Sequence, residues 1–410
     1  MNESNKISNN KDSWLLASIP VVMMILKPYA ISSGSGIFIC DVLVILLFSY
    51  FLTKRRVKFY MPLFLLMCVE IILTLISSLT TLSFHTDIVL AIKIAIVFLL
   101  YLLVYSTIWS TIDPQKFFKI AEAIGLICAI LAILQFVFSS LGFDFYDGKL
   151  PLPMGENSYF GGLFDSNTHD LRVHSFFEEP SYLAFFEIPL VVHFVQENKY
   201  LKAIICALAC ILSGAMTGLL GLIISILLMV LCDKEIEKKY KWYLIGIIFS
   251  VGIVIIILYN SNASLKTLFD YYFRRRTMLE ASMKRADSSF SQRIIGNSML
   301  FTQYNLINRI IGVGFNQYVL YFGLVKDYSN DIVSTLLNFG YIGIVTLITA
   351  IIAIFKNTTS HGRIMLVIFI ILLSVDHSWF GPVFFYVLTW TIMKSDSIDD
   401  KANMFLKVRY

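Results

Sequence analysis

The chain has 410 residues, of which 33 are Lys or Arg, 28 are Asp or Glu and 6 are His, so its formal net charge is +5. Hydrophobic residues make up 57% of it and charged residues 15%, and the mean hydropathy is +0.75. A soluble domain carries roughly 25% charged residues. The composition therefore excludes an ordinary soluble protein and predicts an all-α polytopic membrane protein, a single integral membrane domain over residues 1–410. The expected partner is the lipid bilayer, with no nucleic acid.

Apolar runs recur along nearly the whole chain. A helix needs about 20 residues to cross roughly 30 Å of hydrocarbon. On this criterion we predict about twelve transmembrane helices, at residues 14–30, 37–53, 60–79, 87–110, 118–142, 181–196, 200–214, 216–232, 242–259, 332–355, 364–375 and 382–393. The last two are interrupted from Asp376 to Pro382, which predicts either a tight turn between two short spans or a broken helix.

Basic residues gather at every second connection between these spans, and such residues are held preferentially on the cytoplasmic side. The short connections on the opposite side contain one basic residue, Lys27. The pattern predicts that both termini are cytoplasmic, including the tail 394–410, and that two long loops, 143–180 and 260–331, face outward into the periplasm. The N-terminus lacks a small-residue cleavage site, so we expect a retained first span rather than a removed signal peptide.

The positions of the cysteines and glycines do not predict disulfides, a metal site or a nucleotide-binding site. The six cysteines lie in or at the ends of apolar spans, which predicts no disulfide framework, and Cys206 and Cys210 are expected to pack as apolar residues. Gly312 and Gly314 follow no strand of a nucleotide-binding unit, so loop geometry is the expected reason for them. We predict no cofactor and no essential metal, because outer arginines can supply positive charge to phosphates.

A reaction on the outer side would draw its energy from an activated lipid or an ion gradient, since the chain has no phosphate-binding glycine motif. A transporter is expected to carry ionisable residues deep in several spans. Few are found here, namely Glu70, Lys93 and Glu187, and pairing of the glutamates with Lys93 or a backbone donor explains them as well as function does. Polar residues concentrate in the two outer loops instead, which favours a transferase that uses a lipid-linked donor.

Arg172–Ala184 is the most unusual segment, because it places an arginine, a histidine and two glutamates directly before an apolar run. Ionisable groups at the mouth of a span are costly to desolvate, so a functional site is the first hypothesis. Glu179 or His174 could accept a proton, and Arg172 could hold two phosphate oxygens at once. Glu179 before Pro180 would also suit a helix N-terminus, and Arg172 could be a surface charge.

Three segments follow one another in a distinctive order. Phe176-Phe177-Glu178-Glu179-Pro180-Ser181 begins a span, Gln292-Arg293 is followed by Gly312-Val313-Gly314 in the second loop, and Ser329-Asn330-Asp331 leads to Gly340-Tyr341-Ile342-Gly343. Together with the twelve-span plan, they resemble the O-antigen polymerase and O-antigen ligase superfamily of bacterial polysaccharide assembly. The first is similar to that family's Phe-x-Glu-Pro-Ser segment, the second to its arginine and Gly-x-Gly pair, and the third occupies the place of its His-Asn pair.

The resemblance implies a GT-C-like architecture in the bacterial inner membrane and an O-antigen polymerase. Such an enzyme transfers a growing glycan from undecaprenyl diphosphate to a lipid-linked repeat unit, and a chain-length regulator membrane protein is a candidate partner. In these roles Glu179, His174 or His377 would accept the proton, and Arg172 and Arg293 would hold the diphosphate. Further substrate-binding candidates are Glu178, Asn330 and Asp376, with Tyr159, Phe160, Phe176 and Trp379 as faces for sugar or prenyl chain.

The chain departs from the family pattern at one place. The residue directly before Asn330 is Ser329, whereas ligases and many polymerases carry a candidate catalytic histidine there. His174 or His377 would therefore have to supply the histidine. Asp376 could orient His377, although the two also fit a plain polar turn. The alternative functions are an O-antigen ligase, which differs in acceptor, and a lipid-linked oligosaccharide flippase, which needs intramembrane charges in both halves.

Overall fold

A computed structural model describes residues 3–34, 36–54, 56–80, 87–143, 145–155, 158, 163–165, 170–232, 297–324, 329–375, 379–394 and 405–407. The chain is mostly helical, and within these residues four helices are long and apolar enough to cross a membrane, in keeping with an all-α membrane protein. These four are α3 (Met61–Thr80), α4 (Ile88–Thr111), α5 (Pro114–Ser140) and α16 (Asp331–Lys356).

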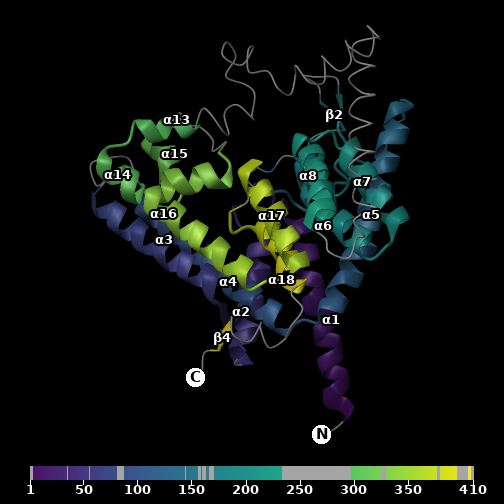
Figure 1. Ribbon diagram of the computed structural model, residues 1–410, viewed down its shortest axis with the longest axis horizontal. Coiled ribbons are helices and arrows are strands. Elements are labelled where there is room, and N and C mark those ends of the chain that lie inside the picture. Colours follow the sequence, from purple (N-terminus) through teal and green to yellow (C-terminus); the bar gives the residue numbers. More distant parts are fainter. Residues whose placement is uncertain are drawn as a thin grey trace.

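The other helices of the described residues are labelled in Figure 1 where there is room: α1 (Glu3–Leu26), α2 (Ile39–Thr53), α6 (Pro180–Gln196), α7 (Tyr200–Leu212), α8 (Met216–Cys232), α13 (Asn297–Thr302), α14 (Leu306–Ile311), α15 (Gln317–Tyr321), α17 (Ser360–Val375) and α18 (Pro382–Met393). Every predicted span coincides with a helix except 242–259, which lies outside the described residues. At 1.5 Å per residue, however, α7 and α18 are only about 20 and 18 Å long, short of a roughly 30 Å crossing. Twelve full crossings and the GT-C-like architecture are therefore not confirmed.

α17 and α18 form an antiparallel hairpin. The Thr359 hydroxyl, just before α17, donates a hydrogen bond of 2.7 Å to the carbonyl of Lys394, just after α18. The two helices also pack against each other. The chain therefore reverses direction between α17 and α18, as the prediction of a turn between two helices requires, and residues 376–378 of this connection lie outside the described residues.

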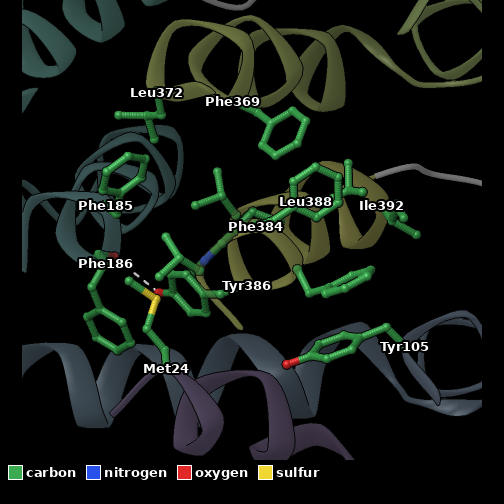
Figure 2. Packing of buried hydrophobic residues seen from close by; sticks show 14 of the residues in the cluster. Met24, Tyr105, Phe185, Phe186, Phe369, Leu372, Phe384, Tyr386, Leu388 and Ile392 are labelled. Atoms are coloured by element: carbon green, nitrogen blue, oxygen red, sulfur yellow. Dashed lines mark hydrogen bonds between the residues drawn. The ribbon is translucent and has the colours of Figure 1, made fainter. Parts of the chain in front are cut away.

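The core gathers around α18, which is buried on every side from Pro382 to Met393. Figure 2 shows Tyr386 of this helix beside Phe186 of α6, with ring centroids 4.7 Å apart, and its hydroxyl donates to the Phe186 carbonyl at 3.1 Å. Tyr105 of α4 stacks on Phe385 of α18, with ring centroids 4.5 Å apart. A helix that is apolar all round is expected at the centre of such an assembly, because it has no face to present to water.

α16 is interrupted at Gly340, where φ is 61° and ψ is −157°. The break frees carbonyl groups of the preceding turn, and the loop after α14 satisfies one of them, because Gly314 N–H donates to the Asn338 carbonyl at 2.7 Å. A Cβ on Gly312 would lie 2.1 Å from that same carbonyl oxygen, and Gly312 has a φ of 72°. The prediction that loop geometry explains Gly312 and Gly314 is confirmed.

Two small antiparallel strand pairs are present, of which one joins distant segments and the other is a local hairpin. β1 (Lys58–Tyr60) pairs with β4 (Phe405–Lys407), and β2 (Phe164–Asp165) pairs with β3 (Asp170–Leu171). In Figure 1, β4 and the first turns of α1 lie at one end of the helical assembly, and β2 and α13 lie at the other. The residues that lead into α6 follow directly from the β2–β3 hairpin at this second end.

Candidate active site

The backbone before α6 is held in place by Gln135 of α5. The Gln135 Oε1 atom accepts the Ser175 N–H at 2.8 Å, and its Nε2 donates to the Ser175 carbonyl at 3.3 Å. Ser175 has a φ of 55°, in the left-handed region that few residues other than glycine adopt. Gly148 packs so closely that a Cβ there would lie 1.6 Å from the Ser175 carbonyl oxygen. One glutamine and one glycine thus determine the path of the chain into α6.

His174 lies inside this turn. Its side chain is 1% exposed, and its carbonyl accepts the Phe177 N–H at 3.0 Å. Val173 and Ser175 on either side are buried as well. In this conformation His174 is buried, whereas Glu179 five residues later is exposed.

The two adjacent glutamates have different surroundings. Glu178 is largely buried, and its Oε2 lies 3.3 Å from the Nζ of Lys27. Glu179 is exposed and occupies the N-cap of α6, with Pro180 as the first helical residue, but its side chain makes no capping hydrogen bond. It accepts a hydrogen bond of 3.1 Å from the Ser181 hydroxyl instead. The prediction that Glu179 stands at the start of a helix is confirmed, and its carboxylate remains at the surface.

Lys27 is a residue of this cluster that the sequence interpretation did not assign to it. Its ammonium lies 3.8 Å from the centre of the Tyr182 ring as well as beside Glu178. Burial disfavours its charged form, but Tyr182 and Glu178 outweigh that effect and hold the Lys27 pKa above its usual range. The signal that could have identified it is its place as the single basic residue in the short outer connections.

Arg172 follows β3 directly and is partly exposed. Its N–H donates to the Leu163 carbonyl at 2.8 Å, which ties the hairpin end to the chain before it. Within the part of the chain that the structure describes, its guanidinium forms no ion pair, in contrast to Lys27. An exposed arginine of this kind has its planar donor set available to an anion.

Asn330 and Asp331 lie at the start of α16 and have clear structural roles. The Asn330 Oδ1 caps the helix by accepting the Val333 N–H at 2.8 Å, and the Asp331 Oδ1 accepts the Trp379 N–H at 2.9 Å. Both side chains are buried. The Trp379 indole in turn lies beside the carboxyl group of Glu70 in α3 without reaching ordinary hydrogen-bond geometry. The turn that contains Trp379 is thereby fastened to α16.

The candidates thus fall into two groups. One comprises Arg172, Glu178, Glu179 and Lys27 at the start of α6, and the other comprises Asn330 and Trp379 at the start of α16. α16 packs on α17, and α18 packs on α6, so this helical hairpin stands between the groups (Figure 1). No hydrogen bond or ion pair joins them within the described residues. Arg293, Asp376, His377, Tyr159 and Phe160 lie outside the described residues.

Other ionisable groups are arranged differently. Glu122 of α5 accepts hydrogen bonds from His193, Lys199 and Lys202 at 3.0, 2.8 and 3.4 Å, which forms a network at the end of α6 and the start of α7. Glu70 and Glu187 are buried inside α3 and α6, and neither carboxyl group forms an ion pair with Lys93 or another described residue. Among the described residues no group of three His, Cys, Asp or Glu side chains is arranged to hold a metal ion. Cys206 and Cys210 are buried free thiols within the apolar core.

Comparison of this chain with protein-family models and with curated proteins found no match in either set.

Proposed function

We propose that the chain is an O-antigen polymerase, a membrane glycosyltransferase that transfers a growing glycan from undecaprenyl diphosphate to a lipid-linked repeat unit. The observation that carries the proposal is the difference between the two adjacent glutamates before α6. Glu179 is exposed at the first turn of the helix, while its neighbour Glu178 is held by Lys27. Arg172, on the same short segment, is partly exposed and has no ion-pair partner within the described residues. A candidate acid–base group, Glu179, and two cations, Arg172 and Lys27, therefore lie near the N-terminus of the apolar helix α6.

The reaction follows from these groups. A hydroxyl of the acceptor's terminal sugar attacks the anomeric carbon of the donor glycan, and its proton passes to the Glu179 carboxylate. The bond between the anomeric carbon and the diphosphate oxygen breaks, and the electron pair stays on the diphosphate. Arg172 stabilises this growing negative charge, because a guanidinium binds two phosphate oxygens in a fork. Glu179 then releases the proton to water.

His174 is buried in the observed turn, so Glu179 is the better base of the two. Arg293 remains the proposed second cation from the loop 260–331, with His377 and Asp376 as further contributors from the turn before Trp379. The proposed setting is the outer face of the bacterial inner membrane with both termini cytoplasmic, where a chain-length regulator membrane protein is a proposed partner.

Gene deletion in the producing strain tests the proposal. A lost polymerase should leave surface lipid that carries a single repeat unit, which a polysaccharide gel resolves. Loss of all attached polymer, with polymer still made on the lipid carrier, would instead identify the alternative O-antigen ligase. A Glu179→Gln variant expressed in the deletion strain should reproduce the deletion phenotype at normal protein abundance.

One observation favours the flippase alternative. Glu70 of α3 and Glu187 of α6 are buried carboxyl groups in different helices, without an ion-pair partner among the described residues. Intramembrane groups of this kind commonly serve ion-coupled transport. The two functions are separated by where the lipid-linked repeat unit accumulates in the deletion strain, since a lost polymerase leaves it outside and a lost flippase leaves it inside.

A further inference from the structure

The residues from Asn297 to Leu324 are unusually poor in charge for a stretch within a long loop between spans. Arg309 is the single Asp, Glu, Lys or Arg residue among them. Two short helices, α13 and α14, occupy its first half and lie beside the N-terminal half of α16 and the end of α3 (Figure 1). A loop that runs through water is expected to be richer in polar and charged residues.

α14 has its polar and apolar faces reversed relative to a helix on a water-exposed surface. Leu306, Ile307 and Ile310 are 74%, 54% and 41% exposed. Asn308 is buried, and Arg309 turns back to donate to the Thr302 carbonyl. A helix in contact with water buries its apolar residues and exposes its polar ones. The reversed arrangement is the one expected where the surroundings are hydrocarbon.

In the irregular backbone after α14, N–H groups are hydrogen-bonded to other parts of the protein, as a hydrocarbon environment requires. Non-helical chain at membrane depth is tolerated where its polar groups are satisfied by protein. Gly314 N–H donates to the Asn338 carbonyl at 2.7 Å, and Phe315 N–H donates to the Thr74 hydroxyl at 3.3 Å. Residues Gly312 to Phe315 are buried against α16 and α3. This stretch could therefore lie below the water interface without leaving these groups unsatisfied.

The exposed face of α13 and α14 continues onto two candidate spans. Phe301 of α13 packs edge-on against Tyr341 of α16, with ring centroids 5.2 Å apart, and Tyr341 is itself exposed. Other large apolar residues exposed on these elements are Met299 on α13, Leu75 and Leu79 on α3 and Val345 on α16. Since α3 and α16 are long and apolar enough to cross a membrane, a bilayer around them would also meet the surface that they share with α14.

We propose that residues 297–311 form a re-entrant element lodged in one leaflet of the bilayer, at the end where α3 finishes and α16 begins. Phospholipid acyl chains cover Leu306, Ile307 and Ile310. The glycine at the break, Gly340, allows α14 to pack closely on α16, because a Cβ at that position would lie 2.5 Å from the Ile310 carbonyl oxygen. The proposal is independent of the catalytic assignment at α6.

Labelling of one introduced cysteine at a time in the full chain, in lipid nanodiscs, tests it. Leu306→Cys and Ile307→Cys are each labelled with the fluorophore NBD, and the unsubstituted chain gives the background from native thiols. Val345→Cys, exposed midway along α16, is the lipid reference, and Asn357→Cys, exposed at the helix end, is the water reference. We expect the labels at 306 and 307 to be quenched by doxyl-labelled phospholipid, as at 345, and reduced by aqueous dithionite several-fold more slowly than at 357.

Dithionite reduction at 306 and 307 as fast as at 357, with no quenching by doxyl-labelled phospholipid, would overturn the proposal. A second measurement leaves the chain unsubstituted. Phospholipid with a diazirine in its acyl chain is photoactivated in the nanodisc, and the adducts are mapped by mass spectrometry. Adducts on the peptide that contains Met299 to Ile310 support lodging in the bilayer, and adducts confined to the long helices contradict it.

Discussion

Lys27 and Glu178 are 151 residues apart in sequence, yet the Lys27 Nζ and the Glu178 Oε2 are 3.3 Å apart. The pair joins the connection between α1 and α2 to the segment before α6. The same two regions meet again where the Ala30 N–H donates to the Pro153 carbonyl at 2.9 Å. A short connection near the start of the chain therefore helps to position the long one that presents Glu179.

Replacement of Lys27 by Met should destabilise the fold, because it leaves the largely buried Glu178 carboxylate without this cation. A lost hydrogen-bonded partner of this kind costs about 1–3 kcal/mol. The measurement is the thermal unfolding midpoint in detergent, with Lys149→Met, at an exposed lysine that forms no ion pair among the described residues, as the matched control. The double variant with Glu178→Gln should lose less than the sum of the single losses. Additive losses would show that the two side chains do not interact.

The raised pKa of Lys27 gives this pair a defined pH dependence. A cation whose pKa is higher in the folded chain stabilises it fully below the unfolded pKa, 10.5 for a lysine, and the contribution is lost as the pH rises through the folded value. The stability difference between the wild type and Lys27→Met should therefore persist from neutral pH up to the unfolded pKa of 10.5 and decline only above it. A difference that vanishes near pH 8 would contradict the assignment.

Glu179→Gln should abolish most polymer synthesis, while Glu178→Gln should reduce it mainly through lower stability. Loss of a general base typically costs on the order of 10² to 10⁴ in rate. Incorporation of labelled repeat units by the purified enzyme measures this, with protein amount and unfolding midpoint as controls. Normal turnover by Glu179→Gln, or equal catalytic losses in two equally stable variants, would remove Glu179 from the role of base.

Gly312 and Gly323 offer a matched pair for the contact between α14 and α16. Both have positive φ, 72° and 62°, but a Cβ on Gly312 would lie 2.1 Å from the Asn338 carbonyl oxygen, and a Cβ on Gly323 would meet nothing. Gly323→Ala should cost about 1–2 kcal/mol, the usual penalty for a left-handed residue. Gly312→Ala should cost distinctly more, since backbone must also move. Equal unfolding midpoints for the two variants would mean that the close approach to α16 does not contribute.

Periodicity and composition were sufficient to predict the long apolar helices, but not α13, α14 and α15, which lie within the stretch predicted as a loop. Long apolar runs placed α3, α4, α5 and α16, and Pro180 after Glu179 marked the start of α6 because proline is favoured at the first helical position. The same logic separated loop glycines from nucleotide-binding ones at Gly312. Each of these features depends on residues close together in sequence.

Features that depend on long-range packing could not be predicted in this way. The pairing of Lys27 with Glu178 and the burial of His174 arise from how α1, α5 and α6 meet, and hydropathy carries no information on distances between helices. Ser175 next to the buried His174 has a left-handed backbone conformation, and nothing in the segment's composition signals that turn. Asn330 was a site candidate for its place in a motif, and the segment gave no sign that its side chain also caps α16.

Gln135 provides the most direct test of how the candidate site is held. Gln135→Met removes the acceptor of the Ser175 N–H and the donor to its carbonyl, and buried backbone groups left without partners cost about 1–3 kcal/mol. We expect a lower unfolding midpoint and faster protease cleavage between α5 and α6. Gln196→Met is the matched control, because the buried amide of Gln196 has no hydrogen-bond partner within the described residues, so its loss should be neutral or stabilising. If the two variants are cleaved at the same rate, Gln135 does not anchor the segment that carries Glu179.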